Sequence, residues 1–157
     1  MKREETIDYN IKIMWHAISR MYNQEASKHD ITTSIGFVLL NIDFEEGTPA
    51  TKIAPLLGLE SRSLTRMLKT MEEKNLIYKM QDPVDKRSVR IFLTEEGKKK
   101  REISARTVKL FNNKVRAYIP EKKLKTFFGV IGDISKVIED MNKENPQENK
   151  KKEIYIN

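Results

Sequence analysis

A basic segment in the middle of the chain, residues 61–74, contains the side chains best suited to bind a charged partner. Arg62, Arg66 and Lys69 follow one another at intervals of four and three residues, so a helix would place them on one face. Three apolar residues repeat this spacing two positions further along, and they are Leu64, Leu68 and Met71. Because two residues turn a helix by roughly 200°, the cations would point away from the core, where arginine can bind guanine through two hydrogen bonds.

Short hydroxyl side chains accompany these cations at the start of the same segment: Ser61, Ser63 and Thr65. The N-terminal turn of a helix offers unpaired backbone N–H groups and a positive dipole, which suit a phosphate. We expect Ser61 to cap this helix and the three hydroxyls to contact bases or backbone. The alternative is an ordinary solvated helix face, on which arginine and lysine are common.

A charged turn follows, residues 81–88, and it predicts a second basic contact. The turn and the strand after it contain two acids and three bases: Asp82, Asp85, Lys86, Arg87 and Arg90. Ion pairs among them can stiffen the loop, which lowers the entropy lost on binding. One cation must stay free to reach a phosphate or the minor groove, and we favour Arg87, then Lys86, with Arg90 as a further contact. Alternatively, an aspartate pairs with Arg87 and the turn is only structural; both can hold, because a guanidinium has several donors.

A helix-turn-helix is expected to position the basic segment. Thr48 and Pro49 suit the N-cap and the first position of a helix that closes at Gly58. Residues 58–60 form a tight turn, and the basic helix follows directly. Asn75 can adopt the left-handed conformation that ends this second helix. Two short helices joined in this way form the helix-turn-helix motif.

A hairpin and several longer helices complete the expected elements. Residues 76–80 and 89–93 have strand patterns, and Thr94 then caps a helix that runs to about Tyr118. Further helices are expected over about residues 6–28, 33–43 and 121–141. The first of them is apolar on more than one side, so we expect it to pack against two neighbours.

The composition narrows the class of protein. The net charge is +7, and residues 60–101 carry five more basic than acidic side chains, as a phosphate-binding surface would. The alternative is a basic surface that only keeps the protein soluble. The chain has no cysteine, which excludes disulfides and thiolate metal sites. No apolar run has the length of a signal peptide or a membrane span, so we expect a cytoplasmic protein.

Residues 48–97 resemble the winged-helix domain of MarR-type transcriptional regulators. The matching segments are residues 53–59, 63–72 and 75–77, the wing pattern Asp82/Asp85/Arg87, and residues 93–97. Asn75 departs from the family, which often has glycine there, although asparagine tolerates the same backbone. The resemblance implies a mainly α fold with a small β-hairpin wing: a winged helix-turn-helix plus N- and C-terminal dimerisation helices.

The resemblance also implies a division of the chain and its partners. Residues 33–99 would be the DNA-binding domain, and residues 1–32 and 100–141 the dimerisation region. The partners would be a second copy of the chain and a palindromic site in double-stranded DNA. Residues 142–157 have no family counterpart, and their charged composition predicts a flexible tail.

Many MarR-type regulators release DNA when a small aromatic or lipid-like effector binds between the dimer helices and the winged domain. The candidate residues for such a pocket are Trp15, His16, Ser19, Arg20 and Phe37. Trp15 could stack on a ring, Arg20 could pair with an anion, and His16 could sense protonation. The alternative places Trp15 and Phe37 in the core and Arg20 on the surface.

We therefore predict a sequence-specific DNA-binding transcriptional regulator, a repressor, that has no membrane partner. Neither an enzyme nor a protein with a cofactor or metal is expected, because His16 and His29 are the only histidines and no Gly-rich phosphate loop occurs. The remaining alternative is a basic winged-helix module that docks to protein or membrane without sequence-specific DNA binding.

Overall fold

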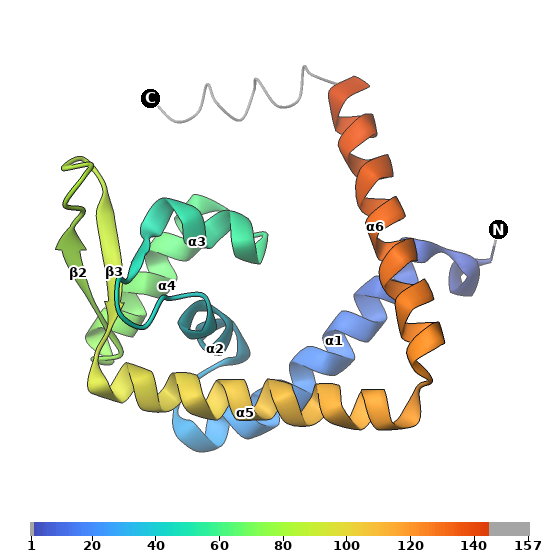
Figure 1. The fold of residues 1–157 in the computed structure, drawn as a ribbon, viewed down its shortest axis with the longest axis horizontal. Coiled ribbons are helices and arrows are strands. Elements are labelled where there is room, and N and C mark those ends of the chain that lie inside the picture. The colour runs from blue at the N-terminus through green and yellow to red at the C-terminus, as the bar shows by residue number, and fades with distance from the viewer. Residues whose placement is uncertain (1, 145–157) are drawn as a thin grey trace. The chain divides into compact units, whose positions relative to one another are not determined.

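The computed structural model describes residues 2–144 of the 157-residue chain (Figure 1). Its elements are, in chain order, η1 (Arg3–Glu5), α1 (Ile7–Ala26), η2 (Ser27–His29), α2 (Thr33–Leu40), β1 (Thr48–Pro49), α3 (Ala50–Leu57), α4 (Ser61–Glu73), β2 (Ile77–Gln81), β3 (Val89–Leu93), α5 (Glu95–Tyr118) and α6 (Glu121–Glu144). This helical fold with one small sheet confirms the predicted class. The chain divides into two compact units, residues 1–110 and 111–157, while the division by role at residues 33 and 99 stays a prediction.

The core of the first unit lies among α2, α3, α4 and one face of the sheet (Figure 1). Its fully buried side chains come from all of these elements and from the loop after α2: Val38, Leu39, Ile42, Ile53, Met71, Ile77 and Ile91. The predicted apolar stripe of α4 is confirmed, because Leu64, Leu68 and Met71 are all buried. The core therefore holds α4 from one side and leaves its opposite side in solvent.

The sheet has a third strand that the sequence did not predict. Its strands are antiparallel in the order β1-β3-β2. Thr48 and Pro49 form β1, so the prediction that they begin a helix was wrong. The Thr48 hydroxyl accepts the N–H of Asp43 at 2.9 Å and donates to the carbonyl of Asn41 at 3.2 Å, which holds this segment extended. Helix α3 therefore begins at Ala50, with Pro49 as its N-cap.

Local signals fixed most of the other helix ends. Gly58 (φ 61°) and Asn75 (φ 55°) adopt the left-handed conformation, as predicted. Thr94 caps α5, because its hydroxyl accepts the N–H of Gly97 at 2.9 Å. Ser61 was wrongly predicted as a cap: it is the first helical residue of α4. The residue before it is the extended N-cap (φ −72°, ψ 145°) and makes no side-chain capping bond.

Helix α2 ends earlier than the predicted boundary near residue 43. Its last helical residue is Leu40. The carboxylate of Asp43 accepts the N–H groups of Glu45 at 2.9 Å and Glu46 at 2.8 Å. These bonds turn the chain into a loop that leads to β1, in place of a further helical turn.

Helix α1 exposes much of its apolar surface. Tyr22 is its one buried residue, whereas five apolar side chains are about half exposed: Ile7, Ile11, Ile13, Met14 and Trp15. Trp15 is 49% exposed, so the interpretation that placed it in the core was wrong. The described residues of the first unit cover this side of the helix only in part, which is why the spacing of apolar residues overstated its burial.

Helix α6 of the second unit shows the same feature. Leu124 is its buried residue, and the exposed apolar side chains are Phe127, Phe128, Val130, Ile131, Val137, Ile138 and Met141. The helix continues to Glu144, so residues 142–144 are helical and the predicted start of the tail was wrong. An ion pair at helical spacing, Lys143 Nζ to Asp140 Oδ1 at 3.0 Å, accompanies this last turn. The rest of the predicted tail lies outside the described residues.

Candidate nucleic-acid interface

One solvent-facing side of α4 carries the basic residues predicted to contact DNA. Arg62, Arg66 and Lys69 are all exposed. Among the described residues, neither arginine takes part in an ion pair, and Lys69 Nζ lies 4.0 Å from Glu73 Oε1. Exposed pairs at such a distance contribute little free energy, so Lys69 can exchange this partner for a phosphate. The arrangement leaves three cations on one side of a helix whose other side is fixed in the core.

The start of α4 adds hydroxyl and backbone donors to this face. Ser61, Ser63 and Thr65 are exposed, and the Thr65 hydroxyl donates to the carbonyl of Ser61 at 2.9 Å. No side chain caps the helix, so its first N–H groups stay open to a phosphate. Ser61 and Thr65 also line a crevice of about 330 Å³ between α3 and α4, together with Thr51 and Pro55.

The tip of the wing is shaped by two aspartates that bind backbone N–H groups. The Asp82 carboxylate is buried and accepts the N–H groups of Asp85 at 3.0 Å and Val84 at 2.9 Å. These two bonds, and then the Arg90 guanidinium, hold the pKa of Asp82 below its usual value. Asp85 in turn accepts the N–H of Arg87 at 3.0 Å. The turn is therefore ordered by its own hydrogen bonds.

The wing cations differ in how far they are engaged. Lys86 and Arg87 are exposed, and within residues 2–144 neither forms an ion pair, so the alternative pairing of Arg87 with an aspartate is not observed. One predicted ion pair does form: Arg90 Nε lies 3.0 Å from Asp82 Oδ2. Arg90 Nη1 also donates to the carbonyl of Glu46 at 3.0 Å, and its side chain is only 21% exposed. A DNA contact by Arg90 stays a prediction, with two of its nitrogens already engaged.

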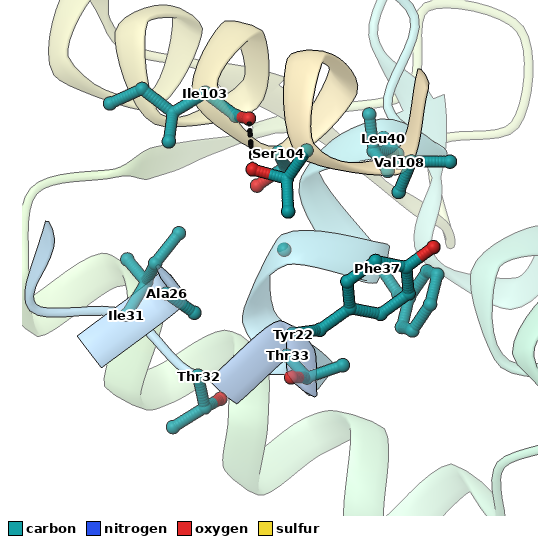
Figure 2. A pocket seen from close by; sticks show the side chains of 12 residues that line it. Tyr22, Ala26, Ile31, Thr32, Thr33, Phe37, Leu40, Ile103, Ser104 and Val108 are labelled. Atoms are coloured by element: carbon teal, nitrogen blue, oxygen red, sulfur yellow. Dashed lines mark hydrogen bonds between the residues drawn. The ribbon is translucent and has the colours of Figure 1, made fainter. Parts of the chain in front are cut away.

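A small apolar pocket lies among α1, α2 and the first half of α5, all within the first unit (Figure 2). Its volume is about 30 Å³, and Tyr22 and Phe37 bring aromatic rings to it. None of its described lining residues carries a charge, and burial raises the pKa of the Tyr22 phenol, which stays neutral. Sequence reasoning missed the α5 wall, formed in part by Ser104 and Thr107. Small hydroxyl side chains three residues apart in a helix of long side chains were a usable signal.

The residues predicted for an effector pocket are mostly elsewhere. Only Phe37 of the five lines the pocket. The ring of Trp15 lies 5.9 Å from that of Phe37, between centroids, and belongs to the exposed side of α1. His16 and Arg20 are exposed, and Ser19 contributes its backbone carbonyl to a hydrogen bond with α2 at 3.3 Å.

Residues 2–144 offer neither a metal site nor a membrane span. No group of three metal-binding side chains is close enough to hold a metal ion. No helix in this range has both the length and the apolar character to cross a membrane.

Comparison with known proteins identifies relatives of the winged unit. The model of the MarR family matches residues 31–89. The HTH-type transcriptional regulator TtmR of Methylorubrum extorquens (strain PA1) is 36% identical over 83 residues, which are 53% of this chain and 43% of TtmR. The HTH-type transcriptional regulator SarZ of Staphylococcus aureus (strain USA300) is 31% identical over 96 residues, 60% of this chain and 65% of SarZ. The matched part thus spans less than two thirds of either relative.

Among solved structures, the crystal structure of the S. aureus MepR–DNA complex is similar to this chain. The TM-score is 0.77 at 22% sequence identity, and the match covers 84% of this chain and 98% of MepR. This likeness extends the shared fold beyond the winged domain to most of the described residues. Over residues 31–89 the sequence matches the MarR family. The fold similarity adds the helix-turn-helix, the wing and the long flanking helices to this match.

Proposed function

We propose that the protein binds a specific sequence in double-stranded DNA and regulates transcription, as a repressor. One observation carries this proposal: α4 presents Arg62 and Arg66 on an exposed side, where no described residue forms an ion pair with them, while the core fixes the helix from behind. The names of TtmR and SarZ as transcriptional regulators support the proposal, as does the crystallisation of MepR with DNA.

The proposed contacts fall into two classes. Arg62 and Arg66 read base edges from α4 in the major groove, because a guanidinium can donate two hydrogen bonds to guanine. The hydroxyls and open N–H groups at the start of α4, and Lys69, bind phosphates and set the register. Lys86 and Arg87 at the wing tip bind the backbone or the minor groove, where sequence is read weakly.

We infer that the functional molecule is a homodimer. The exposed apolar surfaces of α1 and α6 support this inference, because soluble monomers rarely expose so many large apolar side chains. A second copy would cover them across a two-fold axis, and two copies of α4 would then meet two halves of a palindrome.

Selection of bound fragments from random duplex DNA tests the proposal. Two-fold symmetric sites with half-sites about 10 base pairs apart are expected. Binding should also weaken steeply as salt rises, because bound phosphates release counterions. No binding to any duplex at low salt would favour the alternative, a winged-helix module that docks to protein or membrane.

We further propose that an uncharged, ring-sized molecule binds the pocket between α1, α2 and α5 and releases DNA. The described lining of the pocket offers aromatic faces and hydroxyls but no charged side chain, and exposed Arg20 is not part of it. Benzyl alcohol and benzoate are a matched pair of probes that differ mainly in charge. Benzyl alcohol should raise the melting temperature and displace labelled DNA; stronger effects from benzoate would contradict an uncharged ligand.

We also infer that the protein has no catalytic activity and is cytoplasmic. The first inference rests on the sequence, in which two histidines and no nucleophile motif are available for chemistry. The second rests on the lack of an apolar run as long as a signal peptide or a membrane span. Turnover that mutation of His16 abolishes would contradict the first, and fractionation of cells that express the protein tests the second.

A further inference from the structure

Arg90 joins three parts of the first unit through one guanidinium. Its Nε donates to Asp82 Oδ2 at 3.0 Å, beside the wing tip. Its Nη1 donates to the backbone carbonyls of Glu46 at 3.0 Å and Gly47 at 3.4 Å, in the loop before β1. The exposed fractions of the Arg90 and Asp82 side chains are 21% and 6%, so water competes little for these bonds. Strand β3, the wing tip and the loop are thus tied at one point.

The outer half of the hairpin has few other contacts to fix its direction. Met80, Val84 and Val89 are 52%, 91% and 40% exposed. The buried apolar residues of the two strands, Ile77, Ile91 and Leu93, lie at the base of the hairpin or at its middle. Packing and the pairing of β1 with β3, which ends at Arg90, therefore hold the base of the hairpin. Beyond Arg90, side-chain bonds are left to fix the angle of the tip.

The loop that receives Arg90 is itself well anchored. Its Phe44 ring lies 4.7 Å from the guanidinium carbon of Arg101 in α5. Gly47 has a left-handed backbone (φ 64°), and a Cβ there would lie 2.8 Å from the ring of Phe92. The Asp43 carboxylate closes the loop by accepting two backbone N–H groups. A bond from Arg90 to this loop therefore reaches a fixed point on the body.

We propose that Arg90 is a positioning residue: it holds the wing at the angle that lets Lys86 and Arg87 meet DNA while α4 occupies the groove, and it does not touch DNA itself. The inference rests on the proposed DNA-binding function. The donors of a guanidinium form a planar fork that serves a carboxylate and a carbonyl together, whereas an ammonium group is a compact point charge on a flexible stem.

Two substitutions separate this role from a direct phosphate contact. Arg90→Ala removes both charge and fork, and Arg90→Lys keeps the charge alone. A positioning residue requires the fork, so both variants should bind the selected DNA site about fivefold more weakly or worse, a change of about 1 kcal/mol. Near wild-type affinity for Arg90→Lys, with loss only for Arg90→Ala, would show a phosphate contact and overturn the proposal.

A double-mutant cycle with Arg87→Ala tests whether Arg90 acts through the tip. When log K for DNA binding is plotted against log salt concentration, loss of a tip cation should reduce the steepness of the slope by about 1. Once Arg87 is absent, Arg90→Ala should cost clearly less than it does in the wild type, because contacting or coupled residues are not additive. Equal losses in both backgrounds, with a further drop in slope, would contradict positioning.

A matched control comes from an ion pair that joins the hairpin to α4. Lys79 Nζ lies 2.6 Å from Glu72 Oε2. Glu72→Gln breaks this pair without touching Asp82 or the loop, and should change affinity little. Amide hydrogen exchange over residues 82–88 should quicken in Arg90→Lys but not in Glu72→Gln, with an unchanged melting temperature.

The exchange measurement needs no DNA, so it separates the two possible failures. If the wild type binds no duplex, the proposed function fails, while faster exchange at the tip would still report that Arg90 orders the wing. If DNA binding holds and exchange is unchanged in both Arg90 variants, the positioning role is wrong.

Discussion

At Gly97, the first turn of α5 approaches the backbone of Leu76, between α4 and β2, too closely for any side chain. A Cβ built there would lie 1.9 Å from the carbonyl oxygen of Leu76, which already accepts the N–H of Thr94 at 3.1 Å. Gly97→Ala therefore forces α5 and the start of β2 apart by about 1 Å, because backbone cannot rotate away. Overpacking costs about 1–3 kcal/mol and the strained hydrogen bond about 1 kcal/mol, against about 1 kcal/mol gained in helix propensity.

The expected net effect of Gly97→Ala is a loss of about 2 kcal/mol in the free energy of unfolding. Urea unfolding followed by circular dichroism at fixed protein concentration measures it, since association would make stability depend on concentration. Gly132→Ala in α6 is the matched control, because nothing lies within 4 Å of the added Cβ. It should be neutral or stabilising. An unchanged midpoint for Gly97→Ala would refute the close approach on which the reasoning depends.

Three further outcomes are expected. Arg66→Ala should weaken the selected site by about 1–3 kcal/mol and random DNA much less; equal losses would remove its base-reading role. Phe127→Asp should leave the melting of the monomer intact but shift light-scattering mass from dimer to monomer, and an unaltered dimer would place the interface elsewhere. Because hydrogen bonds depress the pKa of Asp82, its contribution to wing order is complete above the usual aspartate pKa near 3.8 and is lost as pH falls through the lower folded value. Hydrogen exchange at the tip should show this acid dependence, and Asp82→Asn should lack it.

The sequence predicted features that depend on a few neighbouring residues. Gly58 and Asn75 were predictable as helix ends because left-handed backbone is costly for most side chains. Thr94 was predictable as a cap because its hydroxyl binds an N–H three residues on. The outward direction of Arg62 and Arg66 followed from the apolar stripe behind them. All of these rest on helical geometry or local hydrogen bonding.

Features that depend on distant residues were not predictable in this way. Thr48 looked like a helix cap, but it pairs with Ile91 of β3, 43 residues away in sequence. Arg90 looked like a DNA contact, and its bonds to the carbonyls of Glu46 and Gly47 cannot be read from its neighbours. The exposure of Trp15 likewise depends on what the rest of the unit leaves uncovered.

The size of the pocket constrains how an effector could act on DNA binding. A cavity of roughly 150 Å³ accommodates benzene, whereas the pocket holds about 30 Å³. A ring-sized ligand must therefore favour an arrangement in which α2 and α5 lie further apart, and only this differential affinity can shift the equilibrium. In the present arrangement α2 and α5 touch closely at Gly36 and Ser104, because a Cβ on Gly36 would lie 2.9 Å from Ser104 Oγ.

Gly36→Val should push α2 away from α5. The contact has no room even for a Cβ, and valine adds two methyl groups beyond it. Val38 and Leu39 of α2 lie in the same hydrophobic core as the buried face of α4. A displacement of α2 should therefore shift α4 and weaken DNA binding in the absence of any ligand. Fluorescence anisotropy with the selected site measures the loss, and Ser104→Ala in the same chain should restore part of it by removing the nearest atom. A folded Gly36→Val variant with wild-type affinity would mean that separation of α2 from α5 is not coupled to the DNA-binding face.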